Sequence, residues 1–239
     1  MLRVLSRIAG KLLSEGPVAT TRWARFHLCE RSRERQLGVN TAAFAPGADR
    51  QNNECEQYEP TCYRCIEQAL DELEIDPERD VFLDYGCGKG RAMTVAATYP
   101  FRKAIGVELA DELAAAAREN LERSAGHHRC REVTVEVTDA TTYRVPAEVS
   151  GIHLFNPFSG SVLEAVVQQI HRSWKTHPRP LTILYKTPGN YPDPFAACDW
   201  LKLHAEVPLD RCRWDHMRLF VYRSVADESR SAERIAPDV

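Results

Sequence analysis

Several absences in this 239-residue sequence narrow what the chain can be. It has no apolar run approaching the roughly 20 residues that a transmembrane helix needs, and nothing in it has the pattern of a secretory signal with its cleavage site. It has little excess charge of either sign, because the formal net charge is −3, which argues against a general nucleic-acid binder. Its eight cysteines are scattered, so we expect a cytoplasmic protein with reduced thiols.

The sequence also lacks internal repeats, and its length suits one large α/β domain with an appendage. Hydrophobic residues make up 44% of the chain, which is enough for a substantial core. We expect an N-terminal helical and loop extension over residues 1–57, the domain itself over 58–226, and a disordered polar tail over 227–239.

The first 37 residues have the pattern of a basic amphipathic helix. Arg3, Arg7 and Lys11 recur every four residues, opposite an apolar side that includes Leu5 and Ile8. We expect this helix to dock on the domain and expose its charges. Attachment to a membrane surface and an organelle-targeting role stay open as alternatives.

The most informative segment is the glycine-rich stretch that follows an apolar run ending in Asp84. Gly86, Gly88 and Gly90 occupy alternate positions. A strand that turns sharply into a helix needs such residues, because glycine tolerates positive φ and lets a ligand approach the backbone. The N–H groups at the start of the new helix then face that ligand.

The spacing of these glycines discriminates between cofactors. The dinucleotide fingerprint G-x-G-x-x-G would require glycine at position 91, where the chain has Arg91. This disfavours an NAD(P) oxidoreductase. The observed D-x-G-x-G-x-G pattern instead resembles motif I of class I S-adenosylmethionine (SAM) methyltransferases. In that family the acid, here Asp84, faces the ammonium end of the cofactor.

The order of the expected elements agrees with that resemblance. Helices are expected after caps at Thr61, Asp111 and Ser161, and directly after Gly90. The last two strands lack a helical crossover and should pair antiparallel. We therefore expect a Rossmann-like, seven-stranded, mostly parallel sheet with an antiparallel final strand and an N-terminal helical cap. The expected strands are 81–85, 104–107, 133–137, 151–155, 181–185, 201–207 and 217–224.

Acidic residues stand at the ends of three successive strands of this sheet, where a doubly wound fold binds its ligand. After the first strand Asp84 can receive the cofactor's ammonium group, and after the second Glu108 can accept both ribose hydroxyls. Asp139 follows the third and can meet the adenine amino group. Each has a simpler alternative as a helix cap or a solvated charge.

Asn156 follows the fourth strand in the segment Phe155-Asn156-Pro157-Phe158. In class I enzymes this strand end lies beside the methyl sulfonium, so Asn156 is a candidate both for contacting the cofactor and for positioning the acceptor. The segment is similar to the N-P-P-Y/F motif of enzymes that methylate adenine or glutamine amides. It lacks the second proline and departs at Ser159, so that activity is not carried over. A turn that stops the strand is the alternative.

The stretch from Tyr58 to Phe158 resembles the catalytic core of the disruptor-of-telomeric-silencing family, the histone lysine methyltransferases without a SET domain. Bacterial proteins that share Gly38-Val39-Asn40-Thr41 are more similar still. This resemblance implies that Tyr58, Glu59 and Thr61 line the cofactor pocket, and it makes Tyr58 a second catalytic candidate. The family's acceptor-lysine channel has no visible counterpart, so histone specificity is not implied. The shared pattern is Tyr58-Glu59-Pro60-Thr61, Phe82 to Gly90, Gly106-Val107-Glu108, Asp139 and Asn156.

Other features allow two interpretations each. Cys62-x-x-Cys65 has the spacing of metal ligands, but no second pair or nearby histidine completes a site, so we expect buried thiols and no metal. Lys186 ends the fifth strand near the expected substrate mouth, where it could contact an anionic substrate. The aromatic residues that could wall a substrate pocket or fill the core are Tyr191, Phe195 and Trp200.

Taken together, these patterns predict an enzyme that moves a methyl group from SAM to an unidentified small molecule or protein side chain and leaves S-adenosylhomocysteine. A general base is needed only if the acceptor is an ammonium or a hydroxyl. Nucleic acid is disfavoured as an acceptor by the net charge. The alternative function is a non-catalytic protein that keeps the fold to bind a partner.

Overall fold

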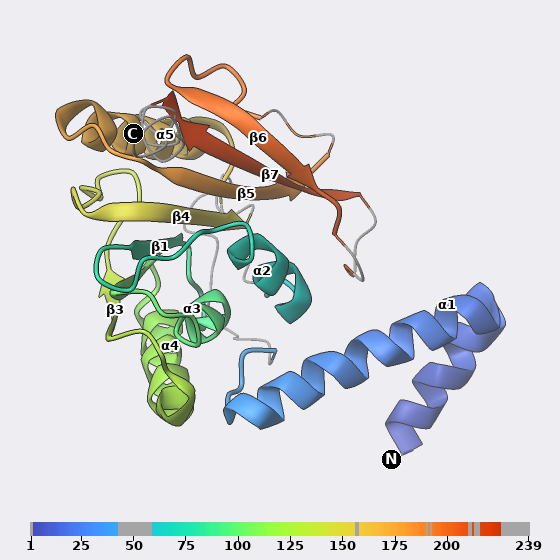
Figure 1. Cartoon of the computed structure of the whole chain (residues 1–239). Helices are drawn as coiled ribbons and strands as arrows, with labels where there is room; N and C mark the ends of the chain where they lie inside the picture. Colours follow the sequence, from blue (N-terminus) through green and yellow to red (C-terminus); the bar gives the residue numbers. More distant parts are fainter. Residues whose placement is uncertain are drawn as a thin grey trace, which may run out of the picture.

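A computed structural model of the chain describes residues 2–42, 59–155, 158–189, 191, 193–209, 212 and 216–225. Its centre is a seven-stranded sheet in the order β3-β2-β1-β4-β5-β7-β6 (Figure 1). The strands are β1 (Val81–Tyr85), β2 (Lys103–Glu108), β3 (Glu132–Val137), β4 (Val149–Phe155), β5 (Thr182–Pro188), β6 (Leu201–Val207) and β7 (Met217–Ser224). The helices are α1 (Leu2–Leu37), α2 (Tyr63–Leu70), α3 (Arg91–Ala96), α4 (Asp111–Ser124), α5 (Gly160–Thr176) and a 3₁₀ turn, η1 (Ala125–His127).

Strand pairing confirms the expected sheet. The β1 strand pairs parallel with β2 and β4, and these continue in parallel to β3 and β5. The β7 strand runs antiparallel to both β5 and β6. All five residues of β1 are buried, as is typical of a parallel strand covered on both faces. The carboxyl ends of β1, β2, β4 and β5 therefore meet at one edge of the sheet.

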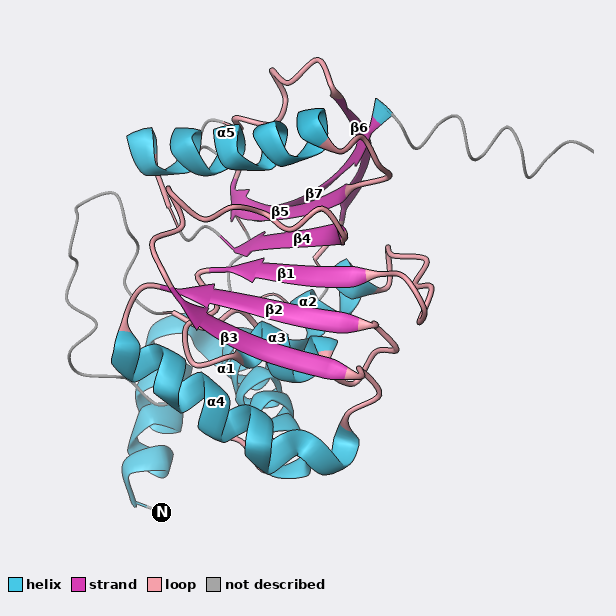
Figure 2. Cartoon of the chain, turned by 90° about the vertical axis from the view of Figure 1, so that its left-hand side faces the viewer, coloured by secondary structure: helices cyan, strands magenta, loops and turns pink. Residues whose placement is uncertain are grey.

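Helices cover both faces of this sheet (Figure 2). On one face, α2, α3, α4 and the end of α1 pack on side chains such as Phe82 and Leu184. On the other face, α5 packs Val166 and Ile170 against Leu83 and Ile152. Each fully buried side chain of this kind contributes about 1.5–3 kcal/mol to folding. The two apolar layers fix β1, and hence the loop that follows it, in the middle of the molecule.

The N-terminal helix is not continuous, contrary to the sequence expectation. Gly16 has φ 82°, outside the helical range, and Pro17 follows it. Proline cannot donate the helical N–H bond and glycine tolerates the left-handed backbone, so the helix bends here. Figure 1 shows the chain doubling back at this point. Among the described residues no helix combines the length and apolar character needed to cross a membrane.

The expected helix caps were wrong in detail. The residues that cap α2, α4 and α5 are Cys62, Ala110 and Ser159, and none of the three makes a side-chain capping bond. Tertiary packing fixes these helix starts in place of the side-chain oxygens. Thr61 in particular uses its hydroxyl for a different contact, described below.

Candidate functional site

The loop after β1 has the backbone that its glycines predict. The φ angles of Gly86, Gly88 and Gly90 are 68°, 55° and 76°, all in the left-handed region that side chains disfavour. Gly90 also needs its small size, because a Cβ there would lie 3.0 Å from the Cβ of Ala117 on α4. Of the three glycines, Gly86 is exposed at the carboxyl edge of the sheet, whereas Gly88 and Gly90 are buried.

The loop is fixed by bonds to the strand and helix beside it. Its Gly86 and Cys87 N–H groups donate to the Val107 carbonyl at 2.9 and 3.0 Å. Further along, the Asn120 side-chain amide of α4 donates to the Lys89 carbonyl at 2.9 Å. Asn120 also accepts the backbone N–H of Asn40, at 2.8 Å. The loop is therefore held in one conformation before any ligand arrives.

Glu108, at the end of β2, is the acid most closely joined to this loop. Its carboxylate accepts backbone N–H bonds from Gly88 at 2.8 Å, Leu109 at 2.9 Å and Ala110 at 3.0 Å. A carboxylate has about four acceptor sites, so these bonds leave capacity for a ligand hydroxyl. Burial raises the pKa of Glu108, and the three backbone bonds partly oppose that rise.

Asp84 is buried and bonded to a partner that the sequence did not suggest. One of its carboxylate oxygens lies 2.7 Å from the Nδ1 of His153. The two residues are directly paired in the parallel register of β1 and β4. A histidine within an apolar strand gave too weak a signal for sequence reasoning to select. The carboxylate that was expected to meet the cofactor ammonium is thus oriented by His153 from the neighbouring strand.

Asp139, after β3, forms a turn. Its Oδ1 accepts from the N–H of Thr141 at 2.8 Å and from the hydroxyl of the same residue at 2.7 Å. This is the local bonding typical of an aspartate at a loop start. The residue is exposed. Contact with an adenine amino group stays a prediction.

Thr61 joins the segment before α2 to the end of β5. Its hydroxyl accepts a hydrogen bond from the Nζ of Lys186 at 2.5 Å. The Lys186 ammonium also lies 4.3 Å from the centre of the Phe155 ring. Because Lys186 is only 2% exposed, it does not stand at an open substrate mouth as expected, and burial lowers its pKa to about 8. The other two candidates, Tyr58 and Asn156, lie outside the described residues.

Arg91 is the residue whose importance sequence reasoning missed. It is the first residue of α3, directly after the loop, and its side chain is buried. The guanidinium forms an ion pair with Glu30 of α1 and donates to the Thr61 carbonyl at 2.9 Å. It also stacks 4.4 Å from the centre of the Tyr63 ring. The sequence showed only that position 91 is not glycine.

The same network holds the end of α1 on the domain. A second α1 acid, Glu34, lies 3.4 Å from the Arg91 guanidinium. One oxygen of Glu34 accepts the N–H and the hydroxyl of Thr41, at 2.7 and 2.8 Å. The Thr41 hydroxyl in turn accepts from Arg91 Nε at 2.7 Å. Acids at positions 30 and 34 share one helix face, which was the only sequence signal for this contact.

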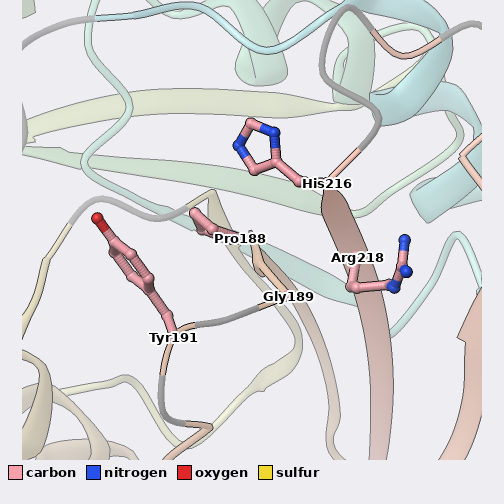
Figure 3. A pocket seen from close by; sticks show the side chains of 5 residues that line it. All are labelled: Pro188, Gly189, Tyr191, His216 and Arg218. Atoms are coloured by element: carbon pink, nitrogen blue, oxygen red, sulfur yellow. The ribbon is translucent and has the colours of Figure 1, made fainter.

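A cavity of about 540 Å³ opens where β5 ends and β7 begins, and its lining includes Pro188, Gly189, Tyr191, His216 and Arg218. Figure 3 shows the Tyr191 and His216 rings on either side of Pro188, with the Arg218 side chain directed away from them. Arg218 pairs with Glu206 of β6, with its Nε 3.1 Å from a carboxylate oxygen.

The three aromatic candidates for a pocket wall lie in different environments. Tyr191 lines the cavity, whereas Phe195 and Trp200 are buried. Phe195 packs 5.1 Å from the ring of Tyr185, and Trp200 stacks 5.0 Å from the ring of His171. Core packing is therefore the correct interpretation of Phe195 and Trp200.

The fold and the loop together define a class of protein. A doubly wound sheet with an antiparallel β7 and a glycine loop after β1 is the class I methyltransferase architecture. Residues 82–177 match the sequence model of a family described as a methyltransferase domain. The chain therefore carries a SAM-dependent methyltransferase domain of class I, and its methyl acceptor is unidentified.

Solved structures support the fold. A putative RNA methyltransferase from Pyrococcus horikoshii is similar with a TM-score of 0.53 at 16% identity, over 81% of this chain and 99% of that chain. A putative methyltransferase, yhhF from Escherichia coli, has a TM-score of 0.51 at 14% identity, over 78% and 90% of the two chains. TrmN from Thermus thermophilus has a TM-score of 0.53 at 19% identity, over 67% of this chain and 48% of that chain. Among curated proteins, no sequence matches significantly. The likeness to the disruptor-of-telomeric-silencing family stays a prediction.

Proposed function

We propose that the chain transfers the methyl group of SAM to a small molecule or a protein side chain. The observation that carries this proposal is the left-handed loop at Gly86, Gly88 and Gly90, with its backbone fixed by Glu108. When bound, SAM supplies the reactive methyl group on its sulfonium. The work left to the chain is to bind the cofactor, orient the acceptor and exclude water.

The residues of the site fit such a cofactor. The glycines would let the loop backbone approach the cofactor closely, and Glu108 has acceptor capacity left for one ribose hydroxyl. Asp84, held by His153, supplies negative charge at the end of β1 for the ammonium group. Asp139 keeps one carboxylate oxygen outside its turn bonds, which suits an amino donor such as adenine. Thr61, with Tyr58, is proposed to border the pocket from the N-terminal side.

The acceptor is proposed to enter through the cavity at the ends of β5 and β7. Its volume of about 540 Å³ lies within the ordinary range of small-molecule sites, about 300–1,000 Å³. Such a volume suits a small molecule or an inserted side chain. We propose that Asn156 and Tyr58 position the acceptor, as their sequence motifs suggest.

We also propose a cytoplasmic location, in which the exposed Cys29 and the other free cysteines stay reduced. A weak contact of the N-terminal helix with a membrane surface is compatible with this location. The large apolar side chains exposed on α1, such as Leu13 at 89% and Val18 at 82%, favour a partner-binding role as the second candidate function.

Calorimetry with SAM, S-adenosylhomocysteine and NAD tests the cofactor assignment. The first two should bind at micromolar affinity and NAD should not. Glu108→Ala should weaken SAM binding roughly ten- to hundredfold, because charge-assisted bonds worth about 1.5–3 kcal/mol are lost. The matched control is Glu112→Ala on the exposed start of α4. Binding of NAD without binding of SAM would overturn the assignment.

The acceptor class is tested with methyl-labelled SAM and fractionated cell extract. Label should enter the small-molecule or the protein fraction and resist nuclease treatment. Asn156→Ala should reduce turnover far more than SAM affinity, as loss of a transition-state contact does. Tight SAM binding with no label transferred to any fraction would instead support the partner-binding role.

A further inference from the structure

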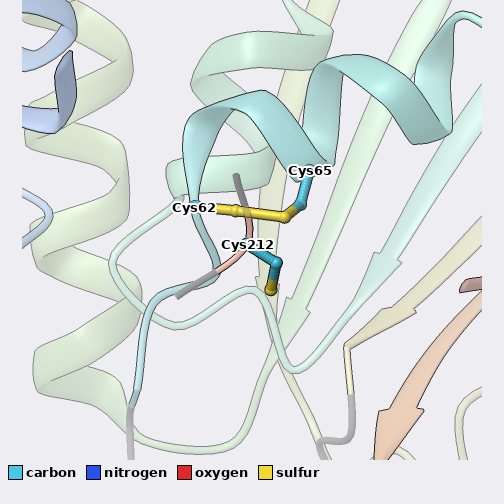
Figure 4. A group of neighbouring side chains, drawn as sticks. All are labelled: Cys62, Cys65 and Cys212. Carbon is cyan, nitrogen blue, oxygen red and sulfur yellow. A yellow bond between two sulfur atoms is a disulfide. The ribbon is translucent and has the colours of Figure 1, made fainter. Parts of the chain in front are cut away.

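Three cysteines come together beside the sheet edge, although one is far from the others in sequence. The sulfurs of Cys62, Cys65 and Cys212 all lie within 4.8 Å of one another (Figure 4). The first two belong to the start of α2, and Cys212 lies in the connection between β6 and β7. All three are buried. Over the described parts of the chain, this is the one group of His, Cys, Asp and Glu ligands found at such a spacing.

The donor set suits a thiophilic divalent ion. Two cysteines separated by two residues are the usual zinc pair, and a third thiolate from another segment adds to it. Three protein ligands with one open position are a common arrangement for zinc, with water or another donor in fourth place. Sequence reasoning rejected a metal here because no second pair or nearby histidine completes the site. Cys212, which the fold brings beside the pair, lies 147 residues after Cys65.

A buried cation lies beside this group of cysteines. The Lys186 ammonium hydrogen-bonds the Cys212 side chain and donates to the hydroxyl of Thr61, next to Cys62. A zinc ion with three thiolates has a net charge of −1, which a neighbouring ammonium offsets. Groups that hydrogen-bond metal ligands in this way orient the ligands and stabilise the site.

We propose that Cys62, Cys65 and Cys212 bind one Zn²⁺ ion when the cysteines are reduced. In the structure Cys62 and Cys65 are joined by a disulfide, so the buried-thiol expectation was wrong for this pair. A thiol or phosphine reductant supplies two electrons, and two protons complete the two thiols as the S–S bond breaks. Zn²⁺ then replaces the three thiol protons, which pass to solvent. The bound ion joins the start of α2 to the β6–β7 connection.

Metal analysis of the full chain tests this proposal without any measurement of methyl transfer. The protein is reduced with a phosphine, freed of metal and titrated with Zn²⁺ against a chromophoric chelator. We expect one Zn²⁺ per chain. Cys212→Ser should lower the affinity by more than about a hundredfold, since loss of an outer-shell partner alone costs about 10–100-fold. Cys198→Ser, outside the cluster, should leave it unchanged.

A second measurement covers the case in which Cys212→Ser fails to fold. Alkylation of the wild-type chain followed by peptide mass spectrometry should show that Zn²⁺ protects these three cysteines and not the exposed Cys29. Absence of stoichiometric Zn²⁺ in the reduced protein, or equal alkylation with and without Zn²⁺, overturns the proposal. Because neither measurement uses SAM, failure here leaves the proposed methyl transfer intact.

Discussion

At the scale of single residues, Glu108 combines two roles that are usually separate. It holds the loop by accepting three backbone N–H bonds, and it is the proposed acceptor for the ribose. Its burial disfavours the charged form, yet the charged form is the one that accepts best. The raised pKa of Glu108 therefore links cofactor binding to pH.

SAM affinity should fall on acidification, with a midpoint above 4.5, the ordinary pKa of a glutamate. The proposed ribose contact needs the ionised carboxylate of Glu108. Because its pKa is raised, Glu108 becomes protonated at a higher pH than an ordinary glutamate, and SAM affinity falls there. Calorimetry over a pH series measures the effect. Glu108→Gln should remove this pH step, whereas Glu112→Gln should keep it. A step that persists in Glu108→Gln would assign the titration to another group.

The Gly90→Ala substitution should destabilise the protein by about 1–3 kcal/mol. A left-handed φ costs an alanine about 1–2 kcal/mol, and the new methyl group meets the Ala117 side chain at 3.0 Å. Urea denaturation measures the change. Gly126→Ala is the matched control, since no atom lies within 4 Å of the added Cβ and its φ is ordinary. Equal stability of the two variants would contradict the close packing of the loop against α4.

At the scale of elements, the docking of α1 depends on the buried charge cluster around Arg91. Removing the cation should cost about 3–5 kcal/mol, because the largely buried carboxylates of Glu30 and Glu34 are left without it. Arg91→Met should therefore lower the free energy of unfolding and make α1 sensitive to limited proteolysis. Arg123→Met, which breaks an exposed pair with Glu119, should have little effect.

The double variant Arg91→Met with Glu30→Gln sharpens this prediction. Removing both charges leaves no uncompensated partner at that position, so part of the lost stability should return. A double variant that is less stable than Arg91→Met would show that the cluster acts through packing and not through charge. Urea denaturation of the wild type, Arg91→Met, Glu30→Gln and the double variant forms a double-mutant cycle. This cycle separates the contribution of charge from that of packing.

Sequence reasoning identified the elements well because their signals are local. The β1 run, the glycines after it and the alternation in β3 all lie within single segments, and β1, β6 and β7 have the expected ends. The contacts that it missed join distant segments. Arg91 meets an acid 61 residues away, and Cys212 meets the start of α2. No local pattern encodes such pairs, whereas the sheet topology creates them.

At the scale of the whole molecule, cofactor binding should appear as thermal stabilisation. A ligand present at a hundredfold excess over its Kd stabilises the folded state by about 2.7 kcal/mol. For a domain of this size that corresponds to a rise in Tm of roughly 5–10 °C. Differential scanning fluorimetry with S-adenosylhomocysteine measures it, and NAD at the same concentration is the control. Equal shifts with both ligands would contradict the specificity expected of the loop.

Arg91 connects the glycine loop to helix α1, so the two parts of the chain can affect each other's binding equilibria. Its backbone continues the cofactor loop, while its side chain is held by α1. Helix α1 is thus a tethered ligand of the loop, present at a high effective concentration set by the connecting chain. We expect cofactor binding and α1 docking to be linked, because Arg91 joins the loop to α1. A molecule that captures α1 then changes SAM affinity by the same factor by which SAM changes the affinity for that molecule.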